Sequence, residues 1–298
     1  MNGFGLVAAE APVAEAAVAS GSPQKTTTRR WDPRLYQIAT LAGLLSYGIW
    51  WLDLEVQLAN AVAIIASVLI TQRACERLAG RARFDPRSTL ISGLSLCLLL
   101  RTGSLDVAVL AAVIAIASKF TLRVRAKHVF NPTNFALVAL MLAGRDMWVS
   151  PGQWGSGLVF AFLLASAGGL VVNRAARADV TLAFLACYAG LLVGRSLWLG
   201  EPLAIPMHRL ENGALVLFSF FMISDPRTTP DSRRGRVLFA ALVALGAYTV
   251  QFWLFRTNGL LWSLAACSLA VPLIDWLLPG ARYQWPAKTS SAEERNLV

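Results

Sequence analysis

Long apolar runs recur along this chain from Leu35 to Leu278, and only short polar joints separate them. A helix of about 20 apolar residues is long enough to cross the hydrocarbon core of a bilayer. More than half of the 298 residues are apolar and only 15% are charged, which leaves too little polar surface for a soluble domain of this length. The pattern predicts an all-α, polytopic membrane protein.

We expect about ten membrane segments between two polar tails. Residues 1–34 lack the basic start of a secretory signal, so they are interpreted as a disordered cytoplasmic tail. Residues 35–278 form the membrane domain, and residues 279–298 form a second cytoplasmic tail. The expected segments are 35–52, 56–72, 89–100, 104–118, 132–144, 156–173, 180–198, 213–224, 237–254 and 259–278.

The basic residues test this topology. All but five of the 27 lysines and arginines fall in the two tails and in every second joint; the five are Arg101, Arg145, Arg195, Arg209 and Arg256. This is the positive-inside pattern, and it predicts a bacterial cytoplasmic (inner) membrane protein with both termini in the cytoplasm. The net charge of +10 therefore reflects topology, and no nucleic-acid partner is expected.

Two of the expected segments, 89–100 and 213–224, are too short to span a bilayer as helices. The sequence LISGLSLCLLL, which begins at Leu90 in the first of these segments, resembles LENGALVLFSFF, which begins at Leu210 and runs into the second. This similarity predicts two five-segment repeats, at about 35–144 and 156–278. An odd number of crossings inverts the second repeat, and paired short segments in inverted repeats indicate a central binding site or pathway.

Two stretches, Lys119–Ala136 and Phe220–Pro230, place polar residues and a proline beside apolar segments. Polar groups beside membrane helices cost free energy, so they more often indicate a functional site than a residue without a role. The candidate residues for a cofactor-binding or pathway site are Lys127, His128, Asn131, Thr133, Asn134, Ser224, Asp225, Arg227, Thr228 and Thr229.

Each stretch also has a structural interpretation. The Ser-Asp-Pro sequence around Asp225 could simply end a helix, or its carboxylate could pair with Arg227, hold a cation or line a pathway. Asn131 could cap a helix that has Pro132 in its first turn. Alternatively, that helix start could face an anionic group such as a phosphate, because the helix dipole is positive there.

No catalytic or metal site is expected. The four cysteines are scattered and are typical of small buried hydrophobic residues. The two histidines, His128 and His208, lie far apart, and no metal-ligand spacing includes either. The sequence contains no nucleophile–base arrangement, no glycine-rich phosphate loop and no paired catalytic carboxylates.

Four motifs together resemble a known family. They are LISG at the start of a short helix, FNP after a basic joint, FMISDP followed by TP, and PLID in the last segment. They are similar to those of the Nqr B/Rnf D family of membrane subunits, found in the sodium-pumping NADH:quinone reductase (Nqr) and in the Rnf electron-transport complex. The resemblance implies a ten-helix fold of inverted repeats, related in architecture to urea channels, and a flavin.

The chain differs from this family in the motif that attaches the flavin. Family members often carry FMN linked covalently to a threonine in a Ser-Gly-Ala-Thr-type motif, and no Ser-x-Ala-Thr occurs here. Covalent FMN is therefore not expected, whereas FMN or riboflavin could bind without a covalent link. The FNPTN and SPGQWG sequences resemble a divergent branch associated with enediyne-type biosynthetic clusters.

The resemblance implies an integral membrane subunit for electron transport coupled to transmembrane transport. Its expected partners are the lipid bilayer and other membrane subunits of an electron-transport complex. Two alternatives remain open: a stand-alone channel or transporter for a small solute or ion, and a membrane component of a natural-product biosynthetic pathway without redox chemistry.

Overall fold

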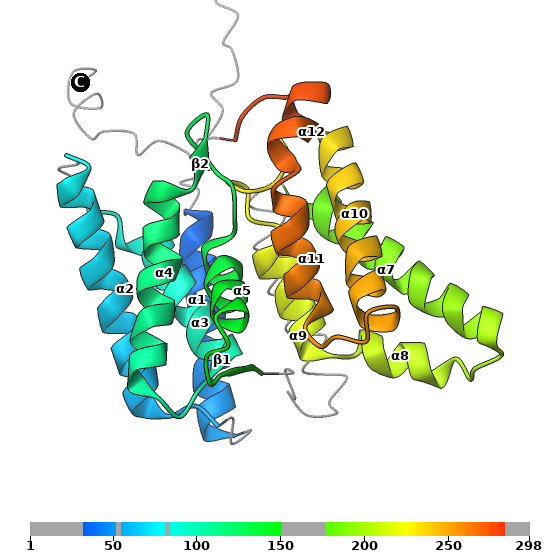
Figure 1. Cartoon of the computed structure of the whole chain (residues 1–298), viewed down its shortest axis with the longest axis horizontal. Helices are drawn as coiled ribbons and strands as arrows, with labels where there is room; N and C mark the ends of the chain where they lie inside the picture. Colours follow the sequence, from blue (N-terminus) through cyan, green and yellow to red (C-terminus); the bar gives the residue numbers. More distant parts are fainter. Residues whose placement is uncertain (1–31, 52–54, 81–83, 151–176, 284–298) are drawn as a thin grey trace, which may run out of the picture. The chain divides into compact units, whose positions relative to one another are not determined.

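The computed structural model describes residues 32–51, 55–80, 84–150 and 177–283, which are mainly α-helical (Figure 1). The helices are α1 (Pro33–Trp50), α2 (Leu58–Leu78), α3 (Pro86–Leu99), α4 (Leu105–Thr121), α5 (Pro132–Leu142), α7 (Ala178–Leu199), α8 (Ala204–Leu210), α9 (Gly213–Leu217), the π-helix η1 (Phe218–Met222), α10 (Arg233–Phe252), α11 (Gly259–Ser268) and α12 (Val271–Leu277). Two short antiparallel strand pairs join β1 (Leu100–Arg101) to β4 (Trp148–Val149) and β2 (Arg123–Val124) to β3 (Lys127–His128).

Several helices have the length and composition of membrane spans. α2, α7 and α10 are each long and apolar enough to cross a bilayer. α11 and α12, which meet at a bend of 51°, have the length and composition of a fourth span if the two are taken together. Pro272 accounts for the bend, because it has no N–H for a hydrogen bond to the carbonyl of Ser268 and its ring crowds that group. The chain is a multi-pass, all-α membrane protein, and its tenth expected segment is a broken helix.

The other expected segments also coincide with helices wherever the chain is described. The eighth, 213–224, consists of α9 continued by η1, and the sixth, 156–173, lies outside the described residues. The short helix α8 is not expected from the sequence, because seven residues are too few for a hydropathy pattern to predict a helix. Most of both expected tails also lies outside the described residues.

The helices pack in pairs around small side chains. α2 packs on α4 and α3, and α10 lies between α7 and α11 (Figure 1). Fully buried alanines recur on α4 and α10, namely Ala108, Ala111, Ala112, Ala115, Ala240 and Ala244. Such residues let helix backbones approach closely in a membrane protein. α5 packs on both α4 and α11 and so links the two parts of the chain.

Gly93 fixes the short helix α3 against α2. A Cβ atom at this position would lie 2.9 Å from Cγ2 of Val68 and 3.0 Å from Cδ1 of Ile65. We therefore expect Gly93→Val to overpack this contact and lower the free energy of unfolding by about 1–3 kcal/mol. Thermal unfolding in mild detergent measures the change. The matched control is Gly43→Val on α1, where an added Cβ atom meets nothing within 4 Å, and an equal loss in both variants would contradict the prediction.

Candidate functional site: a polar cavity where short helices begin and end

The two polar stretches of the sequence meet at one cavity. Its volume is about 60 Å³, and it lies between the start of α3, the end of α4, the start of α5 and the turn that follows η1. Six of the ten candidate residues line it: His128, Asn131, Thr133, Ser224, Asp225 and Arg227. The sequence did not single out its other polar lining residues, which are Arg34, Gln37, Ser88, Ser92, Ser95 and Lys119.

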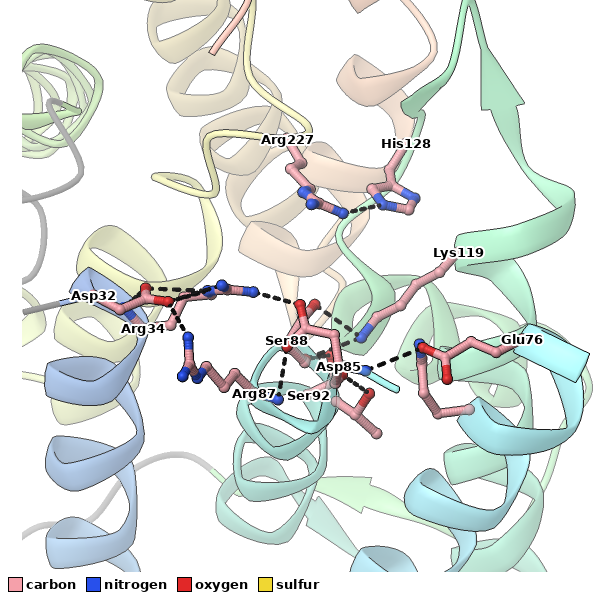
Figure 2. A network of polar contacts seen from close by, with 12 residues as sticks. Asp32, Arg34, Glu76, Asp85, Arg87, Ser88, Ser92, Lys119, His128 and Arg227 are labelled. Carbon is pink, nitrogen blue, oxygen red and sulfur yellow. Dashed lines mark hydrogen bonds and ion pairs between the residues drawn. The ribbon is translucent and has the colours of Figure 1, made fainter. Parts of the chain in front are cut away.

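Ion pairs fix the start of α3 beside this cavity (Figure 2). Asp32 caps α1 and Asp85 caps α3, each by accepting a backbone N–H two residues on. Arg34 joins both carboxylates, at 2.8 Å to Asp32 and 2.5 Å to Asp85. Arg87 pairs with Asp32 at 2.7 Å. Because each cap is also an ion-pair partner of the other helix, α1 and α3 are held together at their starts.

Lys119, in the last turn of α4, is the most buried cation of the cavity. The residue is 6% exposed, and its ammonium donates to the backbone oxygen of Ser88 at 3.0 Å and to the Ser88 hydroxyl at 3.4 Å (Figure 2). In the sequence, Lys119 counts only as one of the basic residues that indicate topology. A helical spacing could have revealed it, because Lys119 follows the buried Ala108, Ala112 and Ala115 on one helix face.

A hairpin positions His128 over the cavity. Arg125 and Ala126 form its tip with φ values of 51° and 64°, as a two-residue hairpin turn of the I′ type requires. Nη1 of Arg227 lies 3.4 Å from Nε2 of His128 (Figure 2). Because a guanidinium can only donate, Nε2 is the acceptor and the proton of the neutral ring is on Nδ1. Burial, and then the neighbouring cations of Arg123, Arg227 and Lys119, lower the pKa of His128 to about 3.

This pKa predicts a pH-dependent stability. The unfolded chain binds a proton on His128 near pH 6.5 and the folded chain only near pH 3, so stability falls as the pH drops below 6.5. Between pH 7 and pH 5 the loss from His128 should be about 2 kcal/mol. Unfolding of wild type and His128→Gln in detergent at both pH values measures it.

The second histidine provides the control. His208→Gln, at an exposed position of α8, should keep the wild-type pH dependence. Comparing the two variants separates the effect of His128 from that of carboxyl groups such as Asp225, whose pKa burial raises. If both variants retain the same slope, His128 does not cause it.

The start of α5 is tied to three other helices. Asn131 caps it by accepting the backbone N–H of Asn134 at 3.2 Å, which confirms the capping interpretation, and its amide also donates to the oxygen of Met222. Thr133 donates to the oxygen of Ser92 in α3 at 3.3 Å. Asn134 is fully buried and donates to the oxygen of Leu261 in α11 at 3.2 Å. Asn134 therefore joins α5 to α11 and does not line the cavity.

The turn after η1 is built around the backbone of Asp225. Its carbonyl oxygen accepts hydrogen bonds from the backbone N–H and the hydroxyl groups of both Thr228 and Thr229, so these threonines hold the turn and do not line the cavity. The Asp225 carboxylate accepts the backbone N–H of Arg227 at 3.0 Å and lines the cavity. The helix-ending and cavity-lining interpretations of this residue are therefore compatible.

Lys127 lies apart from this cavity, in an ion-pair cluster. Its ammonium is 3.0 Å from Asp231 and 2.7 Å from Asp275, and the side chains of all three residues are at most 15% exposed. These residues line a second cavity of about 190 Å³. His128 lines both cavities and therefore lies at their boundary.

The comparisons with known proteins support the family that the sequence motifs suggested. The sequence model described as the NQR2, RnfD, RnfE family matches residues 134–284, slightly more than half of the chain. The D subunit of the ion-translocating oxidoreductase complex of Escherichia coli O7:K1 (strain IAI39 / ExPEC) is 32% identical over 160 residues, which cover 53% of this chain and 42% of the relative. The protein of the same name from Escherichia coli O1:K1 / APEC is 34% identical over 126 residues, or 41% of this chain and 35% of the relative. The alignments thus span less than half the length of these relatives. On the family match, the chain belongs to the NQR2, RnfD, RnfE family.

Proposed function

We propose that this chain is an integral membrane subunit of an electron-transport assembly. The cavity of about 60 Å³ would be a binding site on a transmembrane pathway for a small ion. Family membership supports the proposal, as does the name of the relatives, which are subunits of an ion-translocating oxidoreductase complex. The observation that carries it is the meeting of both polar stretches around one cavity at the ends of short helices. Other membrane subunits of such a complex are the proposed partners.

The packing supports two inverted repeats of five helices each, at about 35–144 and 156–278. α2 packs on α4 in the first part as α7 packs on α10 in the second, and α4 packs on α5 as α10 packs on α11. The short helix α3 has its first residues at the cavity, whereas the equivalent α9–η1 has its last residues there. Opposite ends of equivalent helices meet at one site when the second repeat is inverted. We therefore propose the ten-helix, urea-channel-like architecture.

The size of the cavity favours an ion over a flavin. Pockets for molecules the size of a cofactor usually measure about 300–1,000 Å³, whereas this cavity measures about 60 Å³. It does not fit a flavin ring system, so we assign no flavin step to it. The same observation favours the second candidate function, a stand-alone channel that has no redox chemistry. We propose the bacterial inner membrane as the location, with the cavity and both termini at the cytoplasmic side.

Ion flux and flavin content test the two functions together. Purified protein in liposomes should conduct a small ion, and Ser92→Leu, which fills the cavity, should abolish the flux. The control Thr121→Leu, at an exposed position at the end of α4, should leave it unchanged. Protein isolated from its native membrane should carry flavin absorbance and bring other membrane subunits with it. Flux without flavin or partners would favour the stand-alone channel, and equal flux in Ser92→Leu and wild type would contradict the pathway.

A further inference from the structure

A short segment that follows α12 forms one wall of the larger cavity. Residues 279–283 leave the end of α12 and run toward the β2–β3 hairpin (Figure 1). Pro279, Gly280 and Arg282 line the cavity of about 190 Å³, together with residues of the hairpin and of α12. We call residues 279–283 the C-terminal strap.

The first anchor of the C-terminal strap is a close backbone contact at Gly280. A Cβ atom at this position would lie 2.5 Å from N and 2.6 Å from Cα of Ser232, and 2.7 Å from the carbonyl carbon of Asp231. Backbone atoms cannot move aside as the end of a side chain can, so the close approach requires glycine. Asp231 is itself held by Lys127 and Arg236. The strap therefore lies against a firmly held turn.

The second anchor is the ring of Tyr283. Cζ of Arg177 lies 5.0 Å from the centroid of this ring, which is within the range of a cation–π contact. Arg177 is only 4% exposed and donates to the hydroxyl of Thr229 at 3.2 Å, in the turn after η1. Burial raises the pKa of Tyr283, and the charges of Arg34 and Asp225 also act on it. These two residues line the 60 Å³ cavity, so the strap ends near that cavity.

The rest of the C-terminal strap is exposed. Residues 279–282 are all exposed, and in the described part of the chain their backbone forms no hydrogen bond with another backbone group. Such segments open at a low cost in free energy. The cavity behind the strap is firmly built, because the ion pairs of Lys127 with Asp231 and Asp275 are at its wall. A weakly held segment beside a rigid cavity is typical of a lid.

We propose that the C-terminal strap is a lid that closes and opens the 190 Å³ cavity. In the closed state Gly280 lies against Asp231 and Ser232, and Tyr283 lies on Arg177. Both contacts separate in the open state. The inference rests on the proposed function only in its consequence. Because His128 lines both cavities, the opened strap would be an entrance to the ion pathway.

The reactivity of a thiol inside the cavity tests the lid without any measurement of ion flux. Val129 is partly buried and lines the cavity, so Val129→Cys places a thiol behind the strap. The partly buried native cysteines are replaced by alanine; they are Cys75, Cys187 and Cys267. The rate of reaction with iodoacetamide is measured on the full chain in detergent. Tyr283→Ala should raise this rate about three- to tenfold, the factor that one cation–π contact contributes to an equilibrium.

A second variant and three controls accompany this measurement. Gly280→Ala should also raise the rate, because its Cβ atom pushes the strap away from the backbone behind it. Gly103→Ala, where an added Cβ atom meets nothing within 4 Å, should leave the rate unchanged, as should Tyr283→Phe, which keeps the ring. Cys97, which is 1% exposed, reports on folding: without Val129→Cys, no variant should react.

The outcomes separate the lid from the pathway. Equal rates in Tyr283→Ala, in Gly280→Ala and in the chain without either change, with Cys97 unreactive, would overturn the lid. Faster reaction together with faster ion flux in liposomes would support both proposals. Faster reaction without ion flux in any of these proteins would keep the lid and remove the pathway. Faster flux at an unchanged rate of reaction would keep the pathway and overturn the lid.

Discussion

Replacing Lys127 with methionine should lower the free energy of unfolding by about 3–5 kcal/mol, the usual cost of removing one partner from a buried ion pair. The carboxylates of Asp231 and Asp275 would then lie close together without their cation, at side-chain exposures of 12% and 15%. Oδ1 of Asp275 also accepts the backbone N–H of Asp231 at 2.7 Å, so the two carboxylates cannot simply separate. The loss should therefore appear as lowered thermal stability in detergent.

Two further variants isolate the charge from the packing. Arg125→Met removes an exposed cation from the same hairpin and should cost far less than Lys127→Met. Adding Asp275→Asn to Lys127→Met should recover part of the loss, because it removes one of the stranded charges. Equal stability of Lys127→Met and Arg125→Met would contradict the ion-pair explanation.

The helices were predictable because hydropathy and basic charge are local properties of the chain. In the described residues every expected segment is a helix, and both polar stretches were already expected to mark a site. The break in the tenth segment also has a local signal in the sequence, Pro272, although hydropathy alone does not detect it. The π-helical end of the eighth segment has no comparable local signal.

The partners of the site residues were not predictable, because they are distant in sequence. Lys127 was a candidate for a cofactor-binding or pathway site, and its ion-pair partners, which are 104 and 148 residues away, could not be read from the sequence. The contact of Lys119 with Ser88 could not be predicted, because the two residues are 31 positions apart. Thr228 and Thr229 are close in sequence to the cavity, yet their hydroxyls face the turn itself.

Replacing Arg236 with methionine is the second large expected effect, again about 3–5 kcal/mol of unfolding free energy. Its guanidinium pairs with Asp179 at 2.6 Å, near the start of α7, and donates to the backbone oxygen of Asp231 at 2.7 Å. The side chains of Arg236 and Asp179 are only 12% and 14% exposed, so the carboxylate would be left buried and unpaired. The control is Arg234→Met at an exposed position of the same helix, which should cost little.

Arg236 and Lys127 hold the same residue, Asp231, from its backbone and from its side chain. Once one contact is lost, Asp231 is less well fixed and the other contact stabilises the fold less. The double variant should therefore lose less than the sum of the two single losses, by about 0.5–3 kcal/mol. Unfolding of all four proteins of this cycle in detergent measures the difference. Losses that add to within about 0.5 kcal/mol would mean that the two cations act independently, and that Asp231 does not couple the hairpin to α7 and α10.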